Sequence, residues 1–290
     1  GMSAILMMCM GLLKAGDHVV CSRSMFGSTI KLIGSDLAKF GVESSFVSQT
    51  DLNEWQSAVR PNTRLLFAET PTNPLTEVCD IQALADIAHN AGALFAVDNC
   101  FATPYLQKPI QYGFDLVIHS ATKYMDGQGR VLGGIVVGKQ ELIDKLMFFI
   151  RHTGPALSPF NAWIISKSLD TLGIRMDRHC SNALALAEAL ENHAEIEDVK
   201  YPFLPSHPQY ELAKKQMKAG GGIVYIPAGL WLTGPIVLHN NVELNTARGA
   251  LVTFTKDRSQ YPLKVASFEG VEAARCQSPI SATDAVNIAI

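Results

Sequence analysis

Nucleic-acid and membrane partners are not indicated, because the sequence has little charge imbalance and no long apolar run. Its 24 basic and 27 acidic residues give a formal net charge of −3, whereas a strongly basic surface is what attracts polyanions. The apolar stretch 2–13 is too short to span a bilayer. It also lacks a preceding positive segment and an obvious cleavage site, so we expect a core helix rather than a signal peptide.

Cysteine is scarce and is not arranged for metal binding. No Cys-x-x-Cys pair occurs, so neither a zinc site nor a disulfide framework is predicted. We expect reduced, mostly buried thiols of a cytoplasmic protein. His18 is likewise expected to be structural, because no recognisable metal-ligand spacing surrounds it. The six cysteines are Cys9, Cys21, Cys79, Cys100, Cys180 and Cys276.

What the sequence does contain, through about residue 217, is an alternation of short apolar runs with helical segments. Such alternation predicts an α/β fold with a mostly parallel sheet and helices on both faces. The predicted strands are 18–21, 42–47, 64–68, 94–98, 116–118 and a buried 132–137. The predicted helices are 2–13, one opening at 26–29, 52–59, 81–90, 141–149, 160–192 with a break or bend at Gly173, and 211–218.

The strand 116–118 leads into Ser120, Thr122 and Lys123. Chemistry in open α/β sheets is carried where strands end. A lysine there becomes a nucleophile toward a carbonyl once burial lowers its pKa, and two short hydroxyls beside it suit a phosphate. These groups together suit pyridoxal phosphate. Taken alone, however, a Ser-x-x-Lys match also arises by chance, or in β-lactamases, whose partner Lys-Thr-Gly is absent here.

A carboxylate ends the strand 94–98. Asp98 lies 25 positions before Lys123, and pyridoxal enzymes use an Asp to keep the pyridine nitrogen protonated, so that the ring accepts electrons. In isolation Asp98 is equally compatible with a loop or helix-cap role. A lone phenylalanine such as Phe26 is more often a core residue, and the ordinary role of Asn73, between two prolines, is turn formation.

Five motifs together resemble one enzyme family. Their order and spacing are similar to those of the Cys/Met-metabolism family of pyridoxal-phosphate enzymes over about residues 1–217, and within it to the O-succinylhomoserine sulfhydrylases. The resemblance implies the large domain of a fold-type I PLP-dependent transferase. The motifs are Gly1-Met2, Phe26-Gly27, Glu69-Thr70-Pro71-Thr72-Asn73-Pro74, Val97-Asp98-Asn99 and Ser120-Ala121-Thr122-Lys123-Tyr124.

The resemblance also implies how the cofactor ring and the substrate are held. Lys123 would bond covalently to the cofactor and afterwards serve as the proton-transfer base. Asp98 would hold the pyridinium nitrogen, and Phe26 would stack on the ring. Asn73 and Glu69 would contact the substrate.

The cofactor phosphate would be held by Ser120, Thr122 and the amides of Gly1 and Met2, since a helix N-terminus favours anions. The implied reaction replaces the γ-ester group of an O-acyl homoserine by sulfide and gives homocysteine, in a homodimer or homotetramer. γ-Synthase and lyase chemistry remain open, as does the acyl group. The family's N-terminal Tyr-x-Arg and its C-terminal domain, with the substrate-binding arginine, are absent. We therefore expect a truncated start, weak cofactor binding and little turnover.

The pattern changes at Gly220. Short apolar strands with Gly, Pro and Asn turns follow through residue 254, which suits the first coils of a parallel β-helix. Residues 225–229, 232–236 and 268–272 resemble the N-terminal part of family 28 glycoside hydrolases, the polygalacturonase-like enzymes. Inverting hydrolysis needs a pair of carboxyl groups. We expect Asp257 and Asp284 to be solvated or turn residues instead.

The two resemblances meet within residues 218–224, so we predict two domains, 1–217 and 218–290, in a chimera made by gene fusion or assembly error. An uninterrupted DNA read across the junction tests this. Two other functions remain open: a carbohydrate-active β-helix fragment, or a non-functional fusion whose open strand edges promote aggregation.

Overall fold

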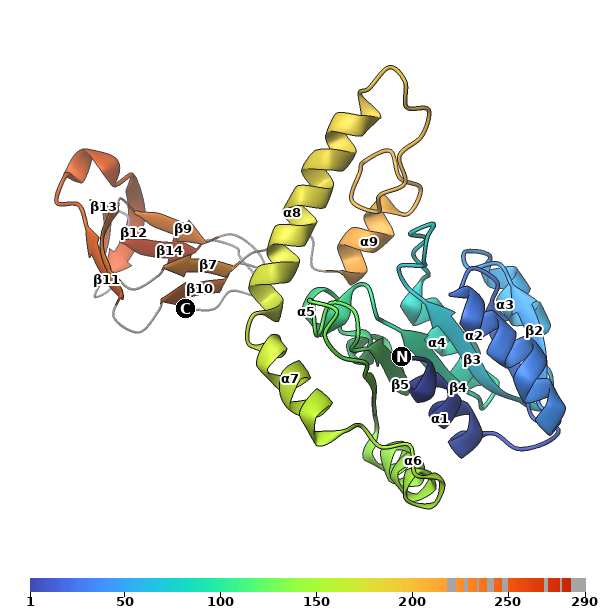
Figure 1. Cartoon of the computed structure of the whole chain (residues 1–290). Coiled ribbons are helices and arrows are strands. Elements are labelled where there is room, and N and C mark those ends of the chain that lie inside the picture. Colours follow the sequence, from blue (N-terminus) through green and yellow to red (C-terminus); the bar gives the residue numbers. More distant parts are fainter. Residues whose placement is uncertain are drawn as a thin grey trace. The chain divides into compact units, whose positions relative to one another are not determined.

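The chain forms two compact units, residues 1–219 and 220–290 (Figure 1). No helix in the described part of the chain is both long and apolar enough to cross a membrane. The computed structural model describes residues 1–217, 223–226, 229–233, 235–238, 243–246, 250–268, 271–276 and 278–282.

A six-stranded sheet forms the centre of the first unit. Its strand order is β2-β1-β3-β4-β5-β6, in which the first five strands are parallel and β6 is antiparallel to β5. The α/β fold with a mostly parallel sheet is therefore confirmed. The strands are β1 His18–Ser22, β2 Glu43–Val47, β3 Thr63–Glu69, β4 Leu94–Asp98, β5 Leu116–Ser120 and β6 Gly134–Gly138.

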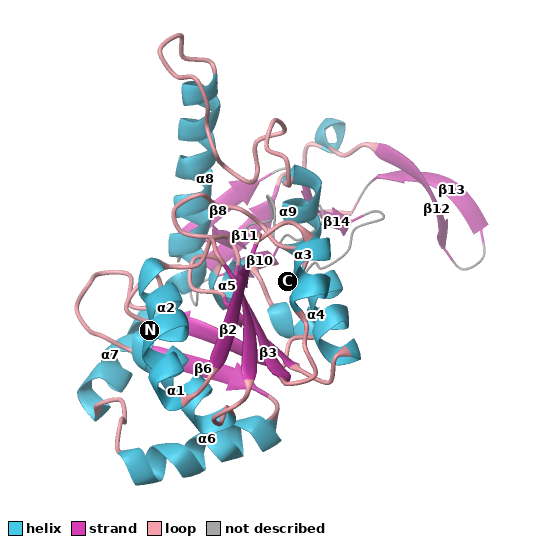
Figure 2. Ribbon diagram, turned by 90° about the vertical axis from the view of Figure 1, so that its right-hand side faces the viewer, coloured by secondary structure: helices cyan, strands magenta, loops and turns pink. Residues whose placement is uncertain are grey.

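Helices cover both faces of this sheet, which explains why the middle residues of its central strands are apolar on both faces. Leu65 and Phe67 of β3 pack into a core with α1, α6 and the segment after α2. Leu66 and Ala68 of the same strand pack into a second core with α3 and α4. Figure 2 shows α1, α2 and α6 on one side of the sheet and α3 and α4 on the other.

The helices of the first unit agree with the predicted ones to within a few residues, with two exceptions: the short helix Thr103–Leu106 was not predicted, and one long predicted helix is divided. The helix predicted over 160–192 is two helices, and the break falls at Asp170 and Thr171, whereas Gly173 lies inside α8. The helices are α1 Met2–Leu12, α2 Gly27–Lys31, α3 Leu52–Ala58, α4 Ile81–Asn90, α5 Thr103–Leu106, α6 Gln140–Thr153, α7 Pro159–Leu169, α8 Leu172–Glu191 and α9 Tyr210–Gln216. A π turn, Leu32–Asp36, and a 3-10 turn, Leu37–Phe40, continue α2, and a further 3-10 turn spans Pro109–Tyr112.

The strand β6 differs from the buried strand predicted over 132–137. It lies at the edge of the sheet, so most of its residues are half-buried and Val137 is exposed, and Leu132 before it is 74% exposed. His18 is buried between the hydroxyls of Thr63 and Ser45, as expected of a structural histidine, and the predicted burial of most thiols is confirmed. Five cysteines are free and four of these are buried, while the side chain of Cys276 lies outside the described residues.

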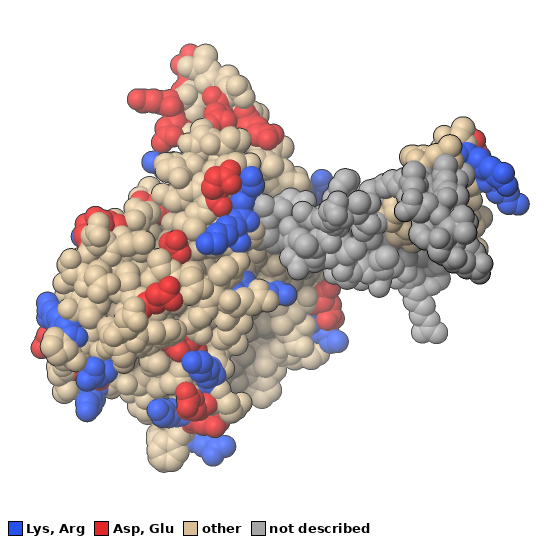
Figure 3. Space-filling model, turned by 180° about the vertical axis from the view of Figure 1, so that it is seen from behind, with Lys and Arg blue, Asp and Glu red and all other residues tan. Residues whose placement is uncertain are grey.

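Charged side chains of both signs are interspersed on the face of the first unit seen in Figure 3. The exception is an acidic group over the end of α8 and the following loop, at the top of that view. It comprises Glu188, Glu191, Glu195, Glu197 and Asp198.

In the second unit, three strands in succession each pair in parallel with a later strand. β7 pairs with β10, β8 with β11 and β9 with β14, while β12 and β13 form an antiparallel hairpin. The strands are β7 Ile223–Ile226, β8 Gly229–Thr233, β9 Ile236–Leu238, β10 Glu243–Thr246, β11 Ala250–Phe254, β12 Leu263–Phe268, β13 Val271–Cys276 and β14 Ile280–Ala282, with a 3-10 turn at Arg258–Gln260.

Candidate active site

A cavity of about 960 Å³ opens where the strands of the first unit end. Parallel strands bring their carboxyl ends to one edge, and the register pairs Glu69 with Asp98 and Asp98 with Ile118. Ligands bind at this edge in open α/β sheets. All nine predicted site residues line the cavity: Gly1, Met2, Phe26, Glu69, Asn73, Asp98, Ser120, Thr122 and Lys123.

Lys123 lies on a turn that follows β5 directly. Its amide donates to the Ser120 carbonyl at 3.1 Å, and its own carbonyl accepts from the Gly127 amide at 2.7 Å. The side chain is exposed to solvent at the cavity wall. Within the described residues its amine makes no ion pair, which leaves it available to a carbonyl compound.

The start of α1 provides hydrogen-bond donors beside Ser120. The first bond within the helix runs from the Ala4 amide to the Gly1 carbonyl at 2.9 Å, so the amides of Met2 and Ser3 precede the helical ladder. A Cβ atom at Gly1 would lie 2.7 Å from Ser120 Oγ, which is closer than real contacts allow. Glycine is therefore required for α1 to begin this close to Ser120.

The Gly133-Gly134 pair packs against the other side of the start of α1, a role that was not predicted. The Gly133 carbonyl accepts from the Gly1 nitrogen at 2.9 Å, and the Gly133 amide donates to Thr122 Oγ1 at 3.1 Å. A Cβ atom at Gly134 would lie 2.9 Å from Ala4 Cβ. The sequence did contain a signal for this pair, namely two consecutive glycines shortly after Lys123.

Asp98 is a buried carboxylate in the cavity wall, with 8% of its surface exposed. Its Oδ1 atom accepts from the Cys100 amide at 3.0 Å. Burial raises the pKa of Asp98 to about 6. A cation placed beside this carboxylate would favour its ionised form.

Glu69 lies in the same wall, but its carboxylate contacts the backbone. It accepts from the Phe26 amide at 2.7 Å and so holds the residue that precedes α2. Burial, and then the negative charge of Asp98, raise the pKa of Glu69 to about 8. The Phe26 ring is 44% exposed. The loop with Asn73 contains two cis peptide bonds, before Pro71 and before Pro74.

A buried amide network that was not predicted supports the ends of β3 and β4. The Asn99 side chain donates to the carbonyls of Thr103 and Gln107, both at 3.0 Å. The Gln107 side chain donates to Asn99 Oδ1 at 2.8 Å and to the Thr70 carbonyl at 3.2 Å. Asn99 follows Asp98 and Thr70 follows Glu69, so the network fixes the two acidic residues relative to each other.

Comparison with known proteins identifies the family. A family model described as "Cys/Met metabolism PLP-dependent enzyme" matches residues 1–229. The chain belongs to this family. Enzymes of the Cys/Met metabolism family use pyridoxal 5'-phosphate. The match runs past the predicted boundary at residue 217 and into the second unit.

Individual members of the family are similar over three quarters or more of the chain. An O-succinylhomoserine sulfhydrylase of Pseudomonas aeruginosa is 55% identical over 224 residues, which are 77% of this chain and 56% of that protein. An L-methionine gamma-lyase of Fusobacterium nucleatum is 44% identical over 247 residues, 84% of this chain and 62% of that protein. The crystal structure of metB from Corynebacterium glutamicum matches with a TM-score of 0.73 and 42% identity, over 75% of this chain and 57% of that one. The chain thus spans little more than half the length of these relatives.

The residues of the cavity fit pyridoxal phosphate. The unbonded amides at the start of α1 and the adjacent Ser120 hydroxyl form a small anion site that only glycine at position 1 permits. Asp98 offers a buried carboxylate to a protonated ring nitrogen. Lys123 offers an amine to an aldehyde in the same cavity.

Proposed function

We propose that this cavity binds pyridoxal phosphate and that the chain carries the cofactor site of an enzyme acting on the γ-substituent of an amino acid. One observation carries the proposal: an amine, a buried carboxylate and a helix N-terminus line a single cavity. These groups match the aldehyde, the ring nitrogen and the phosphate of the cofactor in turn.

Each residue then has a defined task. Lys123 would hold the cofactor aldehyde and would move protons at the substrate carbons. Asp98 keeps the ring nitrogen protonated, and Phe26 covers the ring. The phosphate is held by Ser120, Thr122 and the start of α1. When bound, the cofactor supplies an electron sink for a substrate carbanion.

The substrate proposed is an O-acyl homoserine, and the incoming nucleophile is sulfide. The C–O bond at Cγ breaks, the acyl group leaves as a carboxylate, and a C–S bond forms to give homocysteine. The 55% identity to a sulfhydrylase supports this assignment over lyase chemistry. Asn73 is the proposed substrate contact. Glu69 is proposed to act in the same substrate region indirectly, because its carboxylate accepts a hydrogen bond from the amide of Phe26.

A homo-oligomer is the proposed assembly. Large apolar side chains are exposed on α6 and α7, where Phe148 is 66% and Phe160 63% exposed. Exposed apolar surface of this kind marks protein interfaces. A dimer or tetramer agrees with the family resemblance, and a cytoplasmic location remains a prediction from the reduced thiols.

For the second unit we infer two stacked coils of a β-helix. The support is its pairing pattern: Ile223 aligns with Glu243 and Gly229 with Ala250, as in successive coils of one solenoid. No carbohydrate activity is assigned. Asp257 accepts from the Ser259 amide and caps a turn, as expected, and Asp284 lies outside the described residues. The glycoside hydrolase resemblance and the fusion remain predictions.

The experiment is a visible absorption titration of the purified chain with pyridoxal phosphate. We expect a band that borohydride abolishes and that Lys123→Ala lacks. Lys145→Ala is the matched control, because Lys145 is exposed and lies outside the cavity. Homocysteine release from O-succinylhomoserine and sulfide then tests the reaction. A band of equal strength in Lys123→Ala would overturn the assignment.

A further inference from the structure

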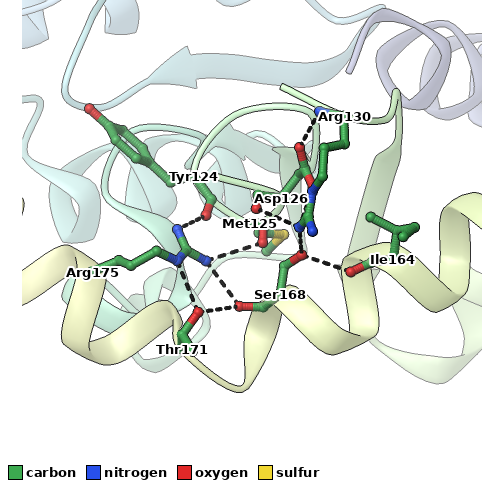
Figure 4. Close-up of polar contacts among 8 residues, drawn as sticks. All are labelled: Tyr124, Met125, Asp126, Arg130, Ile164, Ser168, Thr171 and Arg175. Carbon is green, nitrogen blue, oxygen red and sulfur yellow. Dashed lines mark hydrogen bonds and ion pairs between the residues drawn. The ribbon is translucent and has the colours of Figure 1, made fainter. Parts of the chain in front are cut away.

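The turn that carries Lys123 is bound to the junction between α7 and α8, far along the chain (Figure 4). Arg175, in the first turn of α8, donates from Nη1 to the Tyr124 carbonyl at 2.6 Å. Its Nη2 atom donates to the Met125 carbonyl at 3.3 Å and to the Ser168 carbonyl at 3.0 Å. Thr171 fixes the guanidinium by accepting from Nε at 3.1 Å. One side chain therefore joins both helices to the two residues that follow Lys123.

A second set of contacts fixes the other end of the same turn. The buried carboxylate of Asp126 accepts from the Arg130 amide at 2.7 Å and forms an ion pair with its guanidinium at 2.9 Å. The guanidinium of Arg130 also donates to the Ser168 hydroxyl. Ser168 thus accepts from both arginines, through its hydroxyl and through its carbonyl.

The glycine between these contacts has a steric explanation. Gly127 adopts φ +72°, and a Cβ atom there would lie 2.2 Å from Arg175 Nη1. Any side chain would displace the guanidinium from the turn. This accounts for the first glycine of the Gly-x-Gly-Arg stretch 127–130, which the proposed cofactor site does not use.

We propose that Arg175 is a positioning residue for Lys123. Its planar fork of donors binds two successive carbonyls, which fixes the plane of the turn, and a lysine at this position offers only a point charge. The Lys123 backbone forms part of the same turn through its bonds to Ser120 and Gly127. The orientation of the Lys123 amine toward the cavity therefore depends on the α7–α8 junction. The catalytic significance of this role rests on the proposed function.

The helix α8 makes two further contacts, one with α5 and one with the residue that follows Lys123. The hydroxyl of Tyr105 in α5 donates to the Asp177 carboxylate at 2.8 Å. The ring of Tyr124 lies 5.3 Å from the His179 ring, centroid to centroid. Tyr124, the residue after Lys123, thus contacts α8 through both its carbonyl and its ring, so a displacement of α8 would also displace Tyr124.

The test is hydrogen exchange on the full chain without cofactor. The amides of Lys123, Asp126 and Gly127 are bonded within the turn and report its opening. In Arg175→Ala we expect them to exchange at least about tenfold faster, while the amides of β3 and β4 keep their rates. Arg178→Ala, an exposed arginine on the same helix, should change neither set. Unchanged turn amides, or equal acceleration of turn and sheet amides, would overturn the proposal.

Two further measurements separate positioning from mere stabilisation. Thr171→Val removes one partner of Arg175 with little volume change, so it should accelerate the same amides to a smaller extent even if Arg175→Ala fails to fold. With pyridoxal phosphate, Arg175→Lys should move the pH midpoint of the Lys123-dependent band, and Arg178→Ala should not. An unmoved midpoint counts against positioning. If the unaltered chain shows no such band, the proposed function fails, and the exchange experiment still decides the role of Arg175.

Discussion

At the scale of single residues, Asp98 is the group whose ionisation the cofactor would change most. Its carboxyl is buried, and burial raises its pKa to about 6. We expect Asp98→Asn, which keeps the acceptor for the Cys100 amide, to raise the dissociation constant of pyridoxal phosphate about tenfold or more, because a charge-assisted hydrogen bond is lost.

The affinity for pyridoxal phosphate should also depend on pH, in a direction that the pKa of Asp98 fixes. As the pH falls through about 6, Asp98 becomes protonated and loses its attraction for a ring cation, so binding by the unaltered chain should weaken. Asp98→Asn should lack this acid limb. Fluorescence titrations from pH 5 to pH 8 measure both. If Asp98→Asn binds pyridoxal phosphate as tightly as the unaltered chain at pH 8, the ring nitrogen must be held by a residue other than Asp98.

Glu69 makes a separate contribution to the pH dependence of stability. Its folded-state pKa of about 8 lies above its ordinary value, so folding disfavours the ionised form. The contribution of Glu69 to the free energy of unfolding is fully present below about pH 4.5, where the carboxyl is protonated. It is lost as the pH rises through about 8. We expect Glu69→Gln to gain on the order of 3 kcal/mol relative to the unaltered chain between pH 5 and pH 8. Urea unfolding of both ligand-free proteins measures the difference, and an advantage independent of pH would contradict it.

At the scale of elements, the start of α1 is held at the sheet edge by its buried face. Ile5 and Met8 pack in the core under the helix, so the position of the N-terminal amides is set by the fold rather than by a ligand. The close approach of Gly1 to Ser120 then makes the anion site sensitive to a single methyl group.

Gly1→Ala tests this dependence. A Cβ atom there would overlap Ser120, so α1 and β5 must separate, and we expect the dissociation constant of pyridoxal phosphate to rise by roughly tenfold or more as phosphate hydrogen bonds are lost. Gly27→Ala is the control, because a Cβ atom there meets nothing within 4 Å. Equal affinities for the two variants would show that the start of α1 does not hold the phosphate.

The elements themselves could be predicted, because strands buried on both faces are apolar throughout and parallel strands end at one edge. That geometry is why Asp98, Ser120 and Lys123 could be grouped from sequence, although their roles came from the family resemblance. The break between α7 and α8 could not be placed. It falls where the Thr171 hydroxyl donates to the Ser168 carbonyl, and that local bond outweighs the propensity of Gly173 to interrupt a helix.

Contacts between distant segments were also beyond sequence patterns. The Asn99–Gln107 network reaches Thr70, and Arg175 reaches Tyr124, across loops whose approach only the fold defines. Each is a polar side chain that bonds to backbone carbonyls, and such partners leave no periodicity in the sequence.

At the scale of the whole molecule, the cavity belongs to one unit. Its lining runs from Gly1 to Asn161, all within residues 1–219. The second unit has its own strand pairs and exposes large apolar side chains, including Leu230 and Leu232. Short apolar strands were predicted there, but not which strand would pair with which, since apolar runs of similar length carry no register information.

This division predicts that a chain ending at residue 219 keeps the cofactor site. Because no lining residue is removed, its dissociation constant for pyridoxal phosphate should stay within about threefold of that of the full chain, with the same Lys123-dependent absorption band. The loss of exposed strands should also lower its tendency to aggregate, since unpaired edges and apolar side chains go with them. Titration and light scattering of the two chains side by side measure both effects. A shortened chain that folds but no longer binds the cofactor would mean that the second unit supports the site, and the assignment of the cavity to the first unit alone would have to be abandoned.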